Sequence, residues 1–330
     1  MATISDVARL SGLSRSTVSR VLNNYPYVSE EKKRLVNEAM EQLNYFPNAS
    51  AQKLRNQKTE TIAVLIPMLT NPFFAYLLQG IDTIATENGF QLLVCQTRYD
   101  KEKELNFLNL LKSKQVDGII LTSIENSWDQ LEPFLKYGPI VMCNEYEKTA
   151  KNVPSVRLDQ VYGGYIATRH LIEKGHSTIA YCRGAFRSGI ASDREIGYRL
   201  ALEEFNLPYR EELMFRAAAD SRDGEEVFKK LMTLKERPTG IFTGSDQVAA
   251  GIIKQAKLNG IEVPKELAVV GFDDQPIAEI VVPEITTVKQ PIHEIGEKAM
   301  GLMLNLLLPN ESDSIEEVEL QLQLIERAST

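Results

Sequence analysis

Residues Thr3–Asn24 read TISDVARLSGLSRSTVSRVLNN, and this segment predicts two short amphipathic helices joined by a turn. Thr3 and Asp6 have the spacing of a capping box that begins the first helix, and Gly12 ends it. Ser14 is placed to cap the second helix. The side chains expected to face inward are Val7, Ala8, Leu10, Val18, Val21 and Leu22. Two helices in this arrangement are typical of a helix-turn-helix unit.

The outward side of the second predicted helix is rich in hydrogen-bond donors. Hydroxyl and guanidinium groups in such a position can reach base edges and phosphates in a DNA major groove. These residues are Arg15, Ser16, Thr17, Ser19 and Arg20. The alternative interpretation is an ordinary pair of packed helices with a solvated polar face.

Charge is unevenly distributed along the 330 residues, which carry a formal net charge of −8. Residues 1–60 contain nine Lys and Arg against six Asp and Glu, a balance of +3 that leaves −11 for the remainder. A basic head on an acidic body favours phosphate binding at the N-terminal end of the chain.

Cys95, Cys143 and Cys182 are far apart in apolar surroundings and lack metal-ligand spacing. Buried free thiols are therefore expected, as in a reducing cytoplasm. The N-terminus lacks the pattern of a signal peptide, and no apolar run is long enough to span a bilayer. We therefore expect a cytoplasmic protein without a membrane segment.

Motifs for enzyme chemistry are missing from the sequence. No G-x-G-x-x-G follows a strand, no phosphate-binding loop or G-x-S-x-G elbow is present, and the three histidines are separated. Asp273 and Asp274 follow a predicted strand, where paired carboxylates can do acid–base work, bind a metal or accept hydrogen bonds from a ligand hydroxyl. We expect no enzyme activity, no catalytic residues, no cofactor and no metal.

From Thr61 onward, strand and helix patterns alternate, and the alternation restarts after Asp159. Two similar lobes are therefore expected, each with a doubly wound parallel sheet, and a ligand crevice at the carboxyl ends of the strands. The predicted strands are Thr61–Pro67, Gln91–Gln96, Gly118–Thr122, Pro139–Cys143, Thr178–Arg183, Leu213–Arg216, Gly240–Thr243, Leu267–Gly271 and Val318–Leu324. The predicted helices are Phe73–Asn88, Lys101–Lys114, Asp129–Leu135, Tyr162–Lys174, Asp193–Phe205, Gly224–Leu234, Asp246–Asn259 and Ile295–Leu308.

The expected organisation is an all-α helix-turn-helix head, a short hinge helix with linker, and a two-lobed α/β body. The head covers residues 1–46, the hinge 47–59 and the body 60–330. Lobe 1 is expected to comprise about 60–158 and 289–317, and lobe 2 about 159–288 and 318–330.

Motifs along the whole chain resemble the LacI/GalR family of bacterial transcription regulators. The head carries D-V-A…S-G-L-S…T-V-S-R-V-L-N between Asp6 and Asn23. The body carries Asp117-Gly118-Ile119-Ile120, Gly175-His176, Gly197-Tyr198, Ser245-Asp246, Gly271-Phe272-Asp273-Asp274 and Thr286-Thr287-Val288-Lys289-Gln290. The resemblance implies a repressor of carbohydrate or carbon metabolism genes.

The resemblance further implies a homodimer whose paired heads read a pseudo-palindromic operator in double-stranded DNA. It implies a hinge helix in the minor groove, with Leu54 as the wedge that kinks the central base step. The alternative for Leu54 is a core leucine. The DNA-binding residues implied are Thr3, Ser5, Ser14, Arg15, Ser16, Thr17, Ser19, Arg20, Asn23, Tyr45, Asn48, Ala51 and Leu54.

The body resembles periplasmic sugar-binding proteins, which implies that two lobes close on a small ligand and thereby change operator affinity. The resemblance implies a sugar or a sugar phosphate as effector. The matching positions are Phe73 or Phe74, Arg194, Ser245 and Asp273. An aromatic face stacks on a ring, a guanidinium donates two hydrogen bonds, and a carboxylate accepts from hydroxyl pairs. Some members of the family carry an aromatic residue near the position of Ala219 that closes the ligand site. None is apparent in this sequence, so we expect the sugar ring to stack on an aromatic side chain with one face only.

Tyr25–Lys32 and Tyr137–Val141 look most like the catabolite control branch of the family, in which a phosphorylated carrier protein acts as corepressor. This gives an alternative to a small effector. A sugar-binding transport component and an enzyme of sugar metabolism are alternatives of other classes. The head speaks against the former, and the missing catalytic motifs speak against the latter.

Overall fold

The computed structural model describes residues 2–22, 25–45, 58–147, 149–150, 152–184, 188–308 and 316–330. The chain divides into two compact units, Met1–Thr59 and Glu60–Thr330. They are called here the head and the body, and each is described by itself.

Three helices form the described part of the head: α1 (Ile4–Ser11), α2 (Arg15–Leu22) and α3 (Glu30–Gln42). The capping box predicted at the start of α1 is present, and Gly12 ends the helix with a left-handed φ of 67°. The core residues that are fully buried are Val7, Val18 and Val36, one from each helix. The sequence thus folds as predicted here, because each helix buries one apolar stripe.

Leu10 is a correction to the predicted core of the head, because its side chain is 47% exposed. The face of α1 that packs inward consists of Ile4, Val7 and Ala8, spaced three and four residues apart. Leu10 lies outside this stripe, although it is three residues from Val7.

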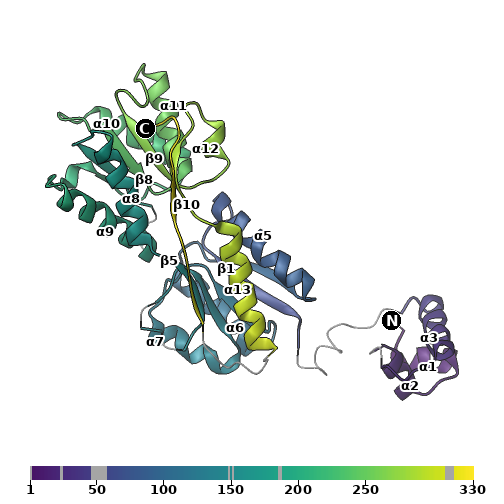
Figure 1. Ribbon diagram of the computed structural model, residues 1–330. Helices are drawn as coiled ribbons and strands as arrows, with labels where there is room; N and C mark the ends of the chain where they lie inside the picture. The colour runs from purple at the N-terminus through teal and green to yellow at the C-terminus, as the bar shows by residue number, and fades with distance from the viewer. Residues whose placement is uncertain are drawn as a thin grey trace. The chain divides into compact units, whose positions relative to one another are not determined.

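The body contains two six-stranded sheets (Figure 1). The first has the order β11-β5-β4-β3-β1-β2 and the second the order β12-β10-β9-β8-β6-β7. All pairings are parallel except that between β10 and β12. The strands of the first sheet are β1 (Thr61–Ile66), β2 (Gln91–Gln96), β3 (Gly118–Leu121), β4 (Ile140–Asn144), β5 (Ser155–Leu158) and β11 (Glu317–Leu320). Those of the second are β6 (Ile179–Cys182), β7 (Met214–Phe215), β8 (Gly240–Thr243), β9 (Ala268–Asp273), β10 (Thr286–Lys289) and β12 (Gln323–Ile325).

Helices cover the sheets, and each sheet with its helices forms one lobe (Figure 1). Lobe 1 has α5 (Pro72–Glu87), α6 (Lys101–Lys112), α7 (Trp128–Leu131), the 3-10 helix η1 (Glu132–Tyr137) and α13 (Ile292–Leu307). Lobe 2 has α8 (Gln160–Glu173), α9 (Gly189–Glu204), η2 (Glu211–Leu213), α10 (Ser221–Met232), α11 (Asp246–Leu258) and α12 (Ile277–Ile280). The two-lobed, doubly wound architecture predicted from the alternating pattern is confirmed.

The structure corrects the prediction at the crossings between the lobes. Ser155–Leu158 forms β5, although this short segment with its Arg157 carried no strand prediction. The single strand expected at 318–324 is two strands that pair in different sheets. Residues 318–320, placed in lobe 2 by the sequence, therefore belong to lobe 1, while Lys289, placed in lobe 1, pairs in the second sheet.

No helix in the described part of the chain is long and apolar enough to span a bilayer. Cys95, Cys143 and Cys182 are buried free thiols, as expected.

Candidate functional site

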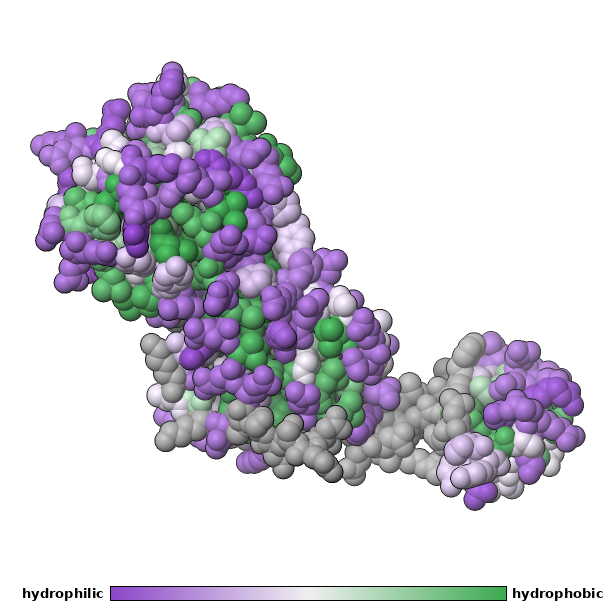
Figure 2. All heavy atoms as spheres, viewed as in Figure 1, coloured by the Kyte–Doolittle hydropathy of each residue, from purple (hydrophilic) through white to green (hydrophobic). Residues whose placement is uncertain are grey.

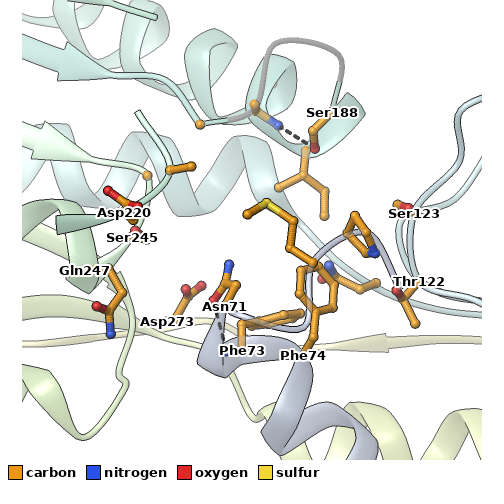
Figure 3. Close-up of a pocket in the computed structure, with 18 of the residues that line it drawn as sticks. Asn71, Phe73, Phe74, Thr122, Ser123, Ser188, Asp220, Ser245, Gln247 and Asp273 are labelled. Carbon is orange, nitrogen blue, oxygen red and sulfur yellow. Dashed lines mark hydrogen bonds between the residues drawn. The ribbon is translucent and has the colours of Figure 1, made fainter. Parts of the chain in front are cut away.

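A cavity of about 190 Å³ lies between the two lobes. Its walls come from segments that follow β1, β3 and β4 in lobe 1 and β6, β8 and β9 in lobe 2. Side chains from both lobes point toward it (Figure 3). The cavity therefore lies at the carboxyl ends of parallel strands, where ligand sites of doubly wound sheets are found.

Phe73 and Phe74 both line this cavity. The Asn71 side chain accepts a hydrogen bond of 3.0 Å from the backbone N–H of Phe73 and so begins α5 beneath the cavity. The two buried rings meet edge to face, with centroids 5.2 Å apart. The family resemblance implied either Phe73 or Phe74 as an effector residue, and the structure places both rings beside the cavity.

Arg194 is buried in the cavity wall. Its Nε donates to Gln160 Oε1 at 2.8 Å and its Nη1 donates to the Gly244 carbonyl at 2.9 Å. The guanidinium carbon lies 3.5 Å from the centroid of the Phe272 ring. These contacts fix the plane of the guanidinium, so that Arg194 is preorganised before a ligand binds.

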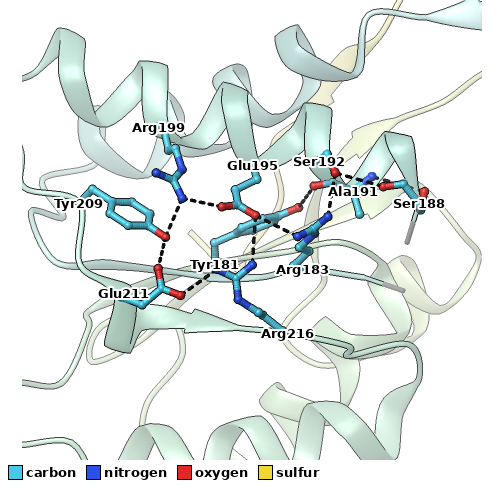
Figure 4. Close-up of polar contacts among 10 residues, drawn as sticks. All are labelled: Tyr181, Arg183, Ser188, Ala191, Ser192, Glu195, Arg199, Tyr209, Glu211 and Arg216. Atoms are coloured by element: carbon cyan, nitrogen blue, oxygen red, sulfur yellow. Dashed lines mark hydrogen bonds and ion pairs between the residues drawn. The ribbon is translucent and has the colours of Figure 1, made fainter. Parts of the chain in front are cut away.

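Helix α9, which carries Arg194, makes polar contacts with residues at the ends of neighbouring strands (Figure 4). Glu195 lies near three guanidinium groups, and its nearest contact is 2.7 Å from Arg199. Arg183 donates to Ser192 Oγ at 2.7 Å. Because these charged groups pair mainly with one another, we interpret the network as a support for α9.

Asp273 ends β9 with an unusual φ of 102°. Its two carboxylate oxygens accept hydrogen bonds from Gln290 Nε2 at 2.6 Å and Gln275 Nε2 at 2.9 Å. Burial raises the pKa of Asp273 to about 6, although nearby Arg194 and both hydrogen bonds oppose this rise. A strained backbone and a desolvated carboxylate beside a cavity are typical of a ligand site.

Asp274 does not belong to the cavity lining. Its carboxylate forms an ion pair of 2.8 Å with Arg327, and both side chains are almost nine-tenths buried. The two adjacent aspartates therefore have different surroundings, which argues against a paired-carboxylate catalytic centre.

Ser245 lines the cavity and caps α11, since its Oγ accepts from the backbone N–H of Val248 at 3.4 Å. The structure therefore brings together Phe73, Phe74, Arg194, Ser245 and Asp273, which are all the effector residues predicted from the sequence.

Glu145 and its neighbour Asn144 line the cavity but were missed in the sequence. Glu145 Oε2 accepts from the backbone N–H of Ile124 at 2.9 Å, and Oε1 accepts from Ser188 Oγ of lobe 2. Burial raises the pKa of Glu145. Their position directly after the predicted strand Pro139–Cys143 was the signal that could have found both residues.

In the head, Ser14 caps α2 by accepting from the backbone N–H of Thr17 at 3.1 Å. Arg15, Ser16 and Arg20 are exposed, whereas Thr17 and Ser19 are half-buried. The side chain of Thr3 is engaged in the capping box of α1, Ser5 is exposed and Tyr45 is half-buried. Asn23, Asn48, Ala51 and Leu54 lie outside the described residues, so their roles stay predictions.

Arg15 and Arg20 lack the carboxylate partner that most other cationic side chains in the described part of the head have. Arg9, Lys33 and Arg34 each have a carboxylate oxygen within 2.8 Å. Neither arginine of α2 has such a partner among the described residues. The surface of α2 therefore offers uncompensated positive charge to a polyanion.

Comparisons with known proteins agree with this geometry. Residues 3–48 match the family model described as bacterial regulatory proteins, lacI family. Residues 59–328 match the model described as periplasmic binding proteins and sugar binding domain of LacI family. The chain is 46% identical to the NTD biosynthesis operon regulator NtdR of Bacillus subtilis over the full length of both proteins. It is 37% identical to catabolite control protein A of Priestia megaterium over 94% of each chain.

Solved structures give the same result. The transcriptional regulator CelR–cellobiose complex is 28% identical, with a TM-score of 0.74 over all of both chains. A LacI family regulator from Lactobacillus casei with bound glucose is 31% identical, with a TM-score of 0.75 over 82% of this chain and 99% of that one. The interpretation as a DNA-binding transcriptional regulator is confirmed, and the transport and enzyme alternatives are not favoured. This chain therefore belongs to the LacI family of bacterial regulatory proteins.

Proposed function

We propose that this regulator acts in the cytoplasm as a homodimeric repressor of carbohydrate metabolism genes, and that a sugar-like ligand in the cavity changes its operator affinity. This proposal rests on one observation: the residues that line the cavity come from both lobes of the body. A ligand that contacts both lobes stabilises one lobe arrangement over others, and only such differential affinity can shift DNA binding.

Relatives with bound sugars support a sugar-like effector. The structures matched include one complex with cellobiose and one with glucose. The similarity to catabolite control protein A keeps a second candidate, in which a phosphorylated carrier protein is the corepressor. The two candidates differ in what changes operator affinity, so one experiment can separate them.

The experiment begins by selecting an operator from a random pool of DNA fragments with the purified full-length protein. Operator affinity is then measured by fluorescence anisotropy with a panel of sugars, amino sugars and sugar phosphates, and separately with a phosphorylated carrier protein. We expect a small molecule to change operator affinity. If only the carrier protein changes it, the second candidate replaces the first, and if no DNA is selected, the repressor proposal fails.

Arg20→Ala is expected to weaken operator binding by about 1–3 kcal/mol if this exposed side chain reads a base edge. Arg34→Ala is the matched control, since this arginine of α3 already pairs with Glu38 at 2.8 Å. The control is expected to bind almost as wild type does. Equal losses by Arg20→Ala on operator and random DNA would leave only a phosphate contact for Arg20.

We assign the dimer contact in lobe 2 to the most exposed large apolar side chains of the body. These are Leu258 at 70%, Val282 at 73% and Ile280 at 75% exposed, at the end of α11 and around α12. Apolar side chains are exposed on both lobes in the view of Figure 2. Leu258, Ile280 and Val282 lie on or next to α11 and α12, two helices that contact each other. Exposed apolar patches mark protein interfaces, and a LacI family operator with two half-sites needs two heads.

Ile280→Glu is expected to convert the dimer to a monomer in light scattering and to weaken operator binding, because the charge would be desolvated at the interface. Leu200→Glu on α9 introduces the same charge at another exposed leucine, 45% exposed, and is expected to leave the dimer intact. An unchanged mass for Ile280→Glu would place the dimer contact elsewhere.

A further inference from the structure

The charges around the cavity point to a more specific ligand than a neutral sugar. Three carboxylates line it, those of Glu145, Asp220 and Asp273. Arg194 is the single cationic side chain among the described lining residues. The described lining therefore carries two more acidic than basic groups, which attracts cations and repels anions.

Two of the three carboxylates are partly compensated by the protein itself. Asp220 caps α10, where its side chain accepts from the backbone N–H groups of Arg222 and Asp223 at the positive end of the helix. Asp273 accepts two side-chain hydrogen bonds and lies in the field of Arg194. These interactions offset part of the cost of the two charges, although burial still dominates at Asp273.

Glu145 is compensated less fully than Asp273, because Arg194 contributes less to it and the neighbouring Glu104 opposes its ionisation. Glu145 is only 7% exposed. Within the described part of the chain, its carboxylate accepts hydrogen bonds only from the Ile124 N–H and from Ser188 Oγ. No Lys, Arg or His nitrogen of the described residues lies within 4.0 Å of it. Burial raises its pKa and the field of Glu104 adds to this rise, which the two hydrogen bonds and the more distant Arg194 oppose only in part. A buried carboxylate without a cation is costly, and an ammonium group of a ligand would offset this cost.

Two buried atoms beside Glu145 independently indicate a ligand with several donors. Asn144 Oδ1 and Ser123 Oγ have no hydrogen-bond partner among the described residues. Both residues line the cavity and are only 6% and 4% exposed. Buried polar atoms are normally paired, so a ligand group that reaches these two atoms would supply the partners that they lack.

We propose that the cavity binds a polyhydroxylated amine, such as an amino sugar in its cationic form, with the ammonium group near Glu145, Asn144 and Ser123. This inference rests on the proposed function and specifies the ligand class of the same site. An ammonium group provides three donors and a positive charge, which match one carboxylate and two unpaired oxygen atoms. The ring hydroxyls are left for Asp273, Arg194 and Ser245.

The acidic lining of the cavity argues against a sugar phosphate, which the family resemblance implied as one candidate effector. Phosphate is usually held by clusters of arginine or lysine, which provide charge-assisted hydrogen bonds. Arg194 already donates to Gln160 and Gly244, and a phosphate would also lie near buried Glu145. A phosphorylated sugar should therefore bind more weakly than its unphosphorylated counterpart.

The test is calorimetry of the full-length wild-type protein with matched probes. The probes are glucose, its 2-amino, 3-amino and 6-amino deoxy derivatives, N-acetylglucosamine, glucose 6-phosphate, and the galactose and mannose counterparts of glucosamine with their parent sugars. We expect at least one amine to bind at least tenfold more tightly than its neutral parent, and N-acetylation to remove the gain. A neutral or phosphorylated sugar that binds more tightly than every amine overturns this inference but leaves the proposed function standing. If no probe binds, both fail.

Glu145→Gln tests the assigned position of the ammonium group. The amide keeps an acceptor for Ile124 N–H but removes the charge, so the preference for the amine over its neutral parent should fall to less than threefold. Glu147→Gln removes the same charge from the same loop outside this cavity lining and should keep the preference. Binding of the neutral parent reports whether Glu145→Gln is folded. A retained preference in a folded Glu145→Gln protein contradicts the assignment.

Discussion

Replacing Gly197 by alanine is expected to destabilise the body by about 3 kcal/mol, because overpacking against backbone atoms cannot be relieved by a side-chain movement. A Cβ atom at Gly197 would lie 1.9 Å from the Val161 carbonyl oxygen and 2.5 Å from the Tyr165 nitrogen, both in α8. Gly164 of α8 is equally confined, since its Cβ would lie 2.2 Å from the Arg194 carbonyl oxygen. The two helices must therefore separate to accept the methyl group.

The same separation is expected to weaken ligand binding. Arg194 belongs to α9, and its backbone is in contact with Gly164 across this helix pair. Movement of α9 would change the distance from the guanidinium to Gln160 on α8, which now accepts from it at 2.8 Å. Misplacing a preorganised donor by a fraction of an ångström costs affinity.

Gly301→Ala is the control for this prediction. Gly301 lies within α13, and a Cβ atom there would have no neighbour within 4 Å. An alanine at such a helical site should stabilise the protein by about 0.5–1 kcal/mol. Urea unfolding followed by circular dichroism compares both variants with wild type. If Gly197→Ala is as stable as Gly301→Ala, the close packing of α8 and α9 is not as described.

The adjacent residues Asp273 and Asp274 are expected to respond in opposite directions to the same substitution. Asp273→Asn should raise the free energy of unfolding at pH 7.5 by about 1–2 kcal/mol. Burial raises the pKa of Asp273 from its ordinary 3.8 to about 6 in the folded protein. This difference corresponds to an upper limit of about 3 kcal/mol, from which about 1 kcal/mol is subtracted for a lost hydrogen bond.

The effect of Asp273→Asn should depend on pH. An acid whose pKa is raised on folding binds more protons in the folded state, so its contribution to stability decreases as the pH rises from about 4 to about 6. The gain from the substitution should therefore be present at pH 7.5 and absent at pH 4. The same variant should lose the ligand response while its DNA binding without ligand stays nearly intact, since Asp273 lines the cavity.

Asp274→Asn should instead lower the free energy of unfolding by about 2 kcal/mol, because it breaks a largely buried ion pair. Arg327 keeps contacts with Glu279 at 3.2 Å and with the Ile285 carbonyl at 3.0 Å, which limits the loss. Urea unfolding of both variants at pH 4 and pH 7.5 tests the pair. A loss of stability in Asp273→Asn at pH 7.5 would show that its hydrogen bonds outweigh the desolvation of its charge.

The helix-turn-helix head and the strand–helix alternation of the body were determined by the sequence alone. Both follow from local patterns: the capping box at Thr3, the left-handed glycine at Gly12, and apolar runs such as Thr61–Ile66. The place of the ligand crevice could also be predicted, because parallel strands bring their carboxyl ends to one edge, whereas the individual effector residues were implied by the family resemblance. Asp273 is the residue for which the strand-end position itself indicated a ligand contact.

The tertiary structure alone decided which strands pair and which polar groups are left without compensation. Residues 317–325 cross from one sheet to the other, and a hydrophobic pattern does not specify a partner strand. Leu10 has a helical spacing yet is exposed, because burial depends on which face meets a neighbour. The surroundings of Glu145 likewise depend on groups remote in sequence, among them Ser188 of the other lobe, which donates a hydrogen bond to it. Desolvation and charge compensation arise from such packing, so the acidic character of the cavity could be recognised only in the folded chain.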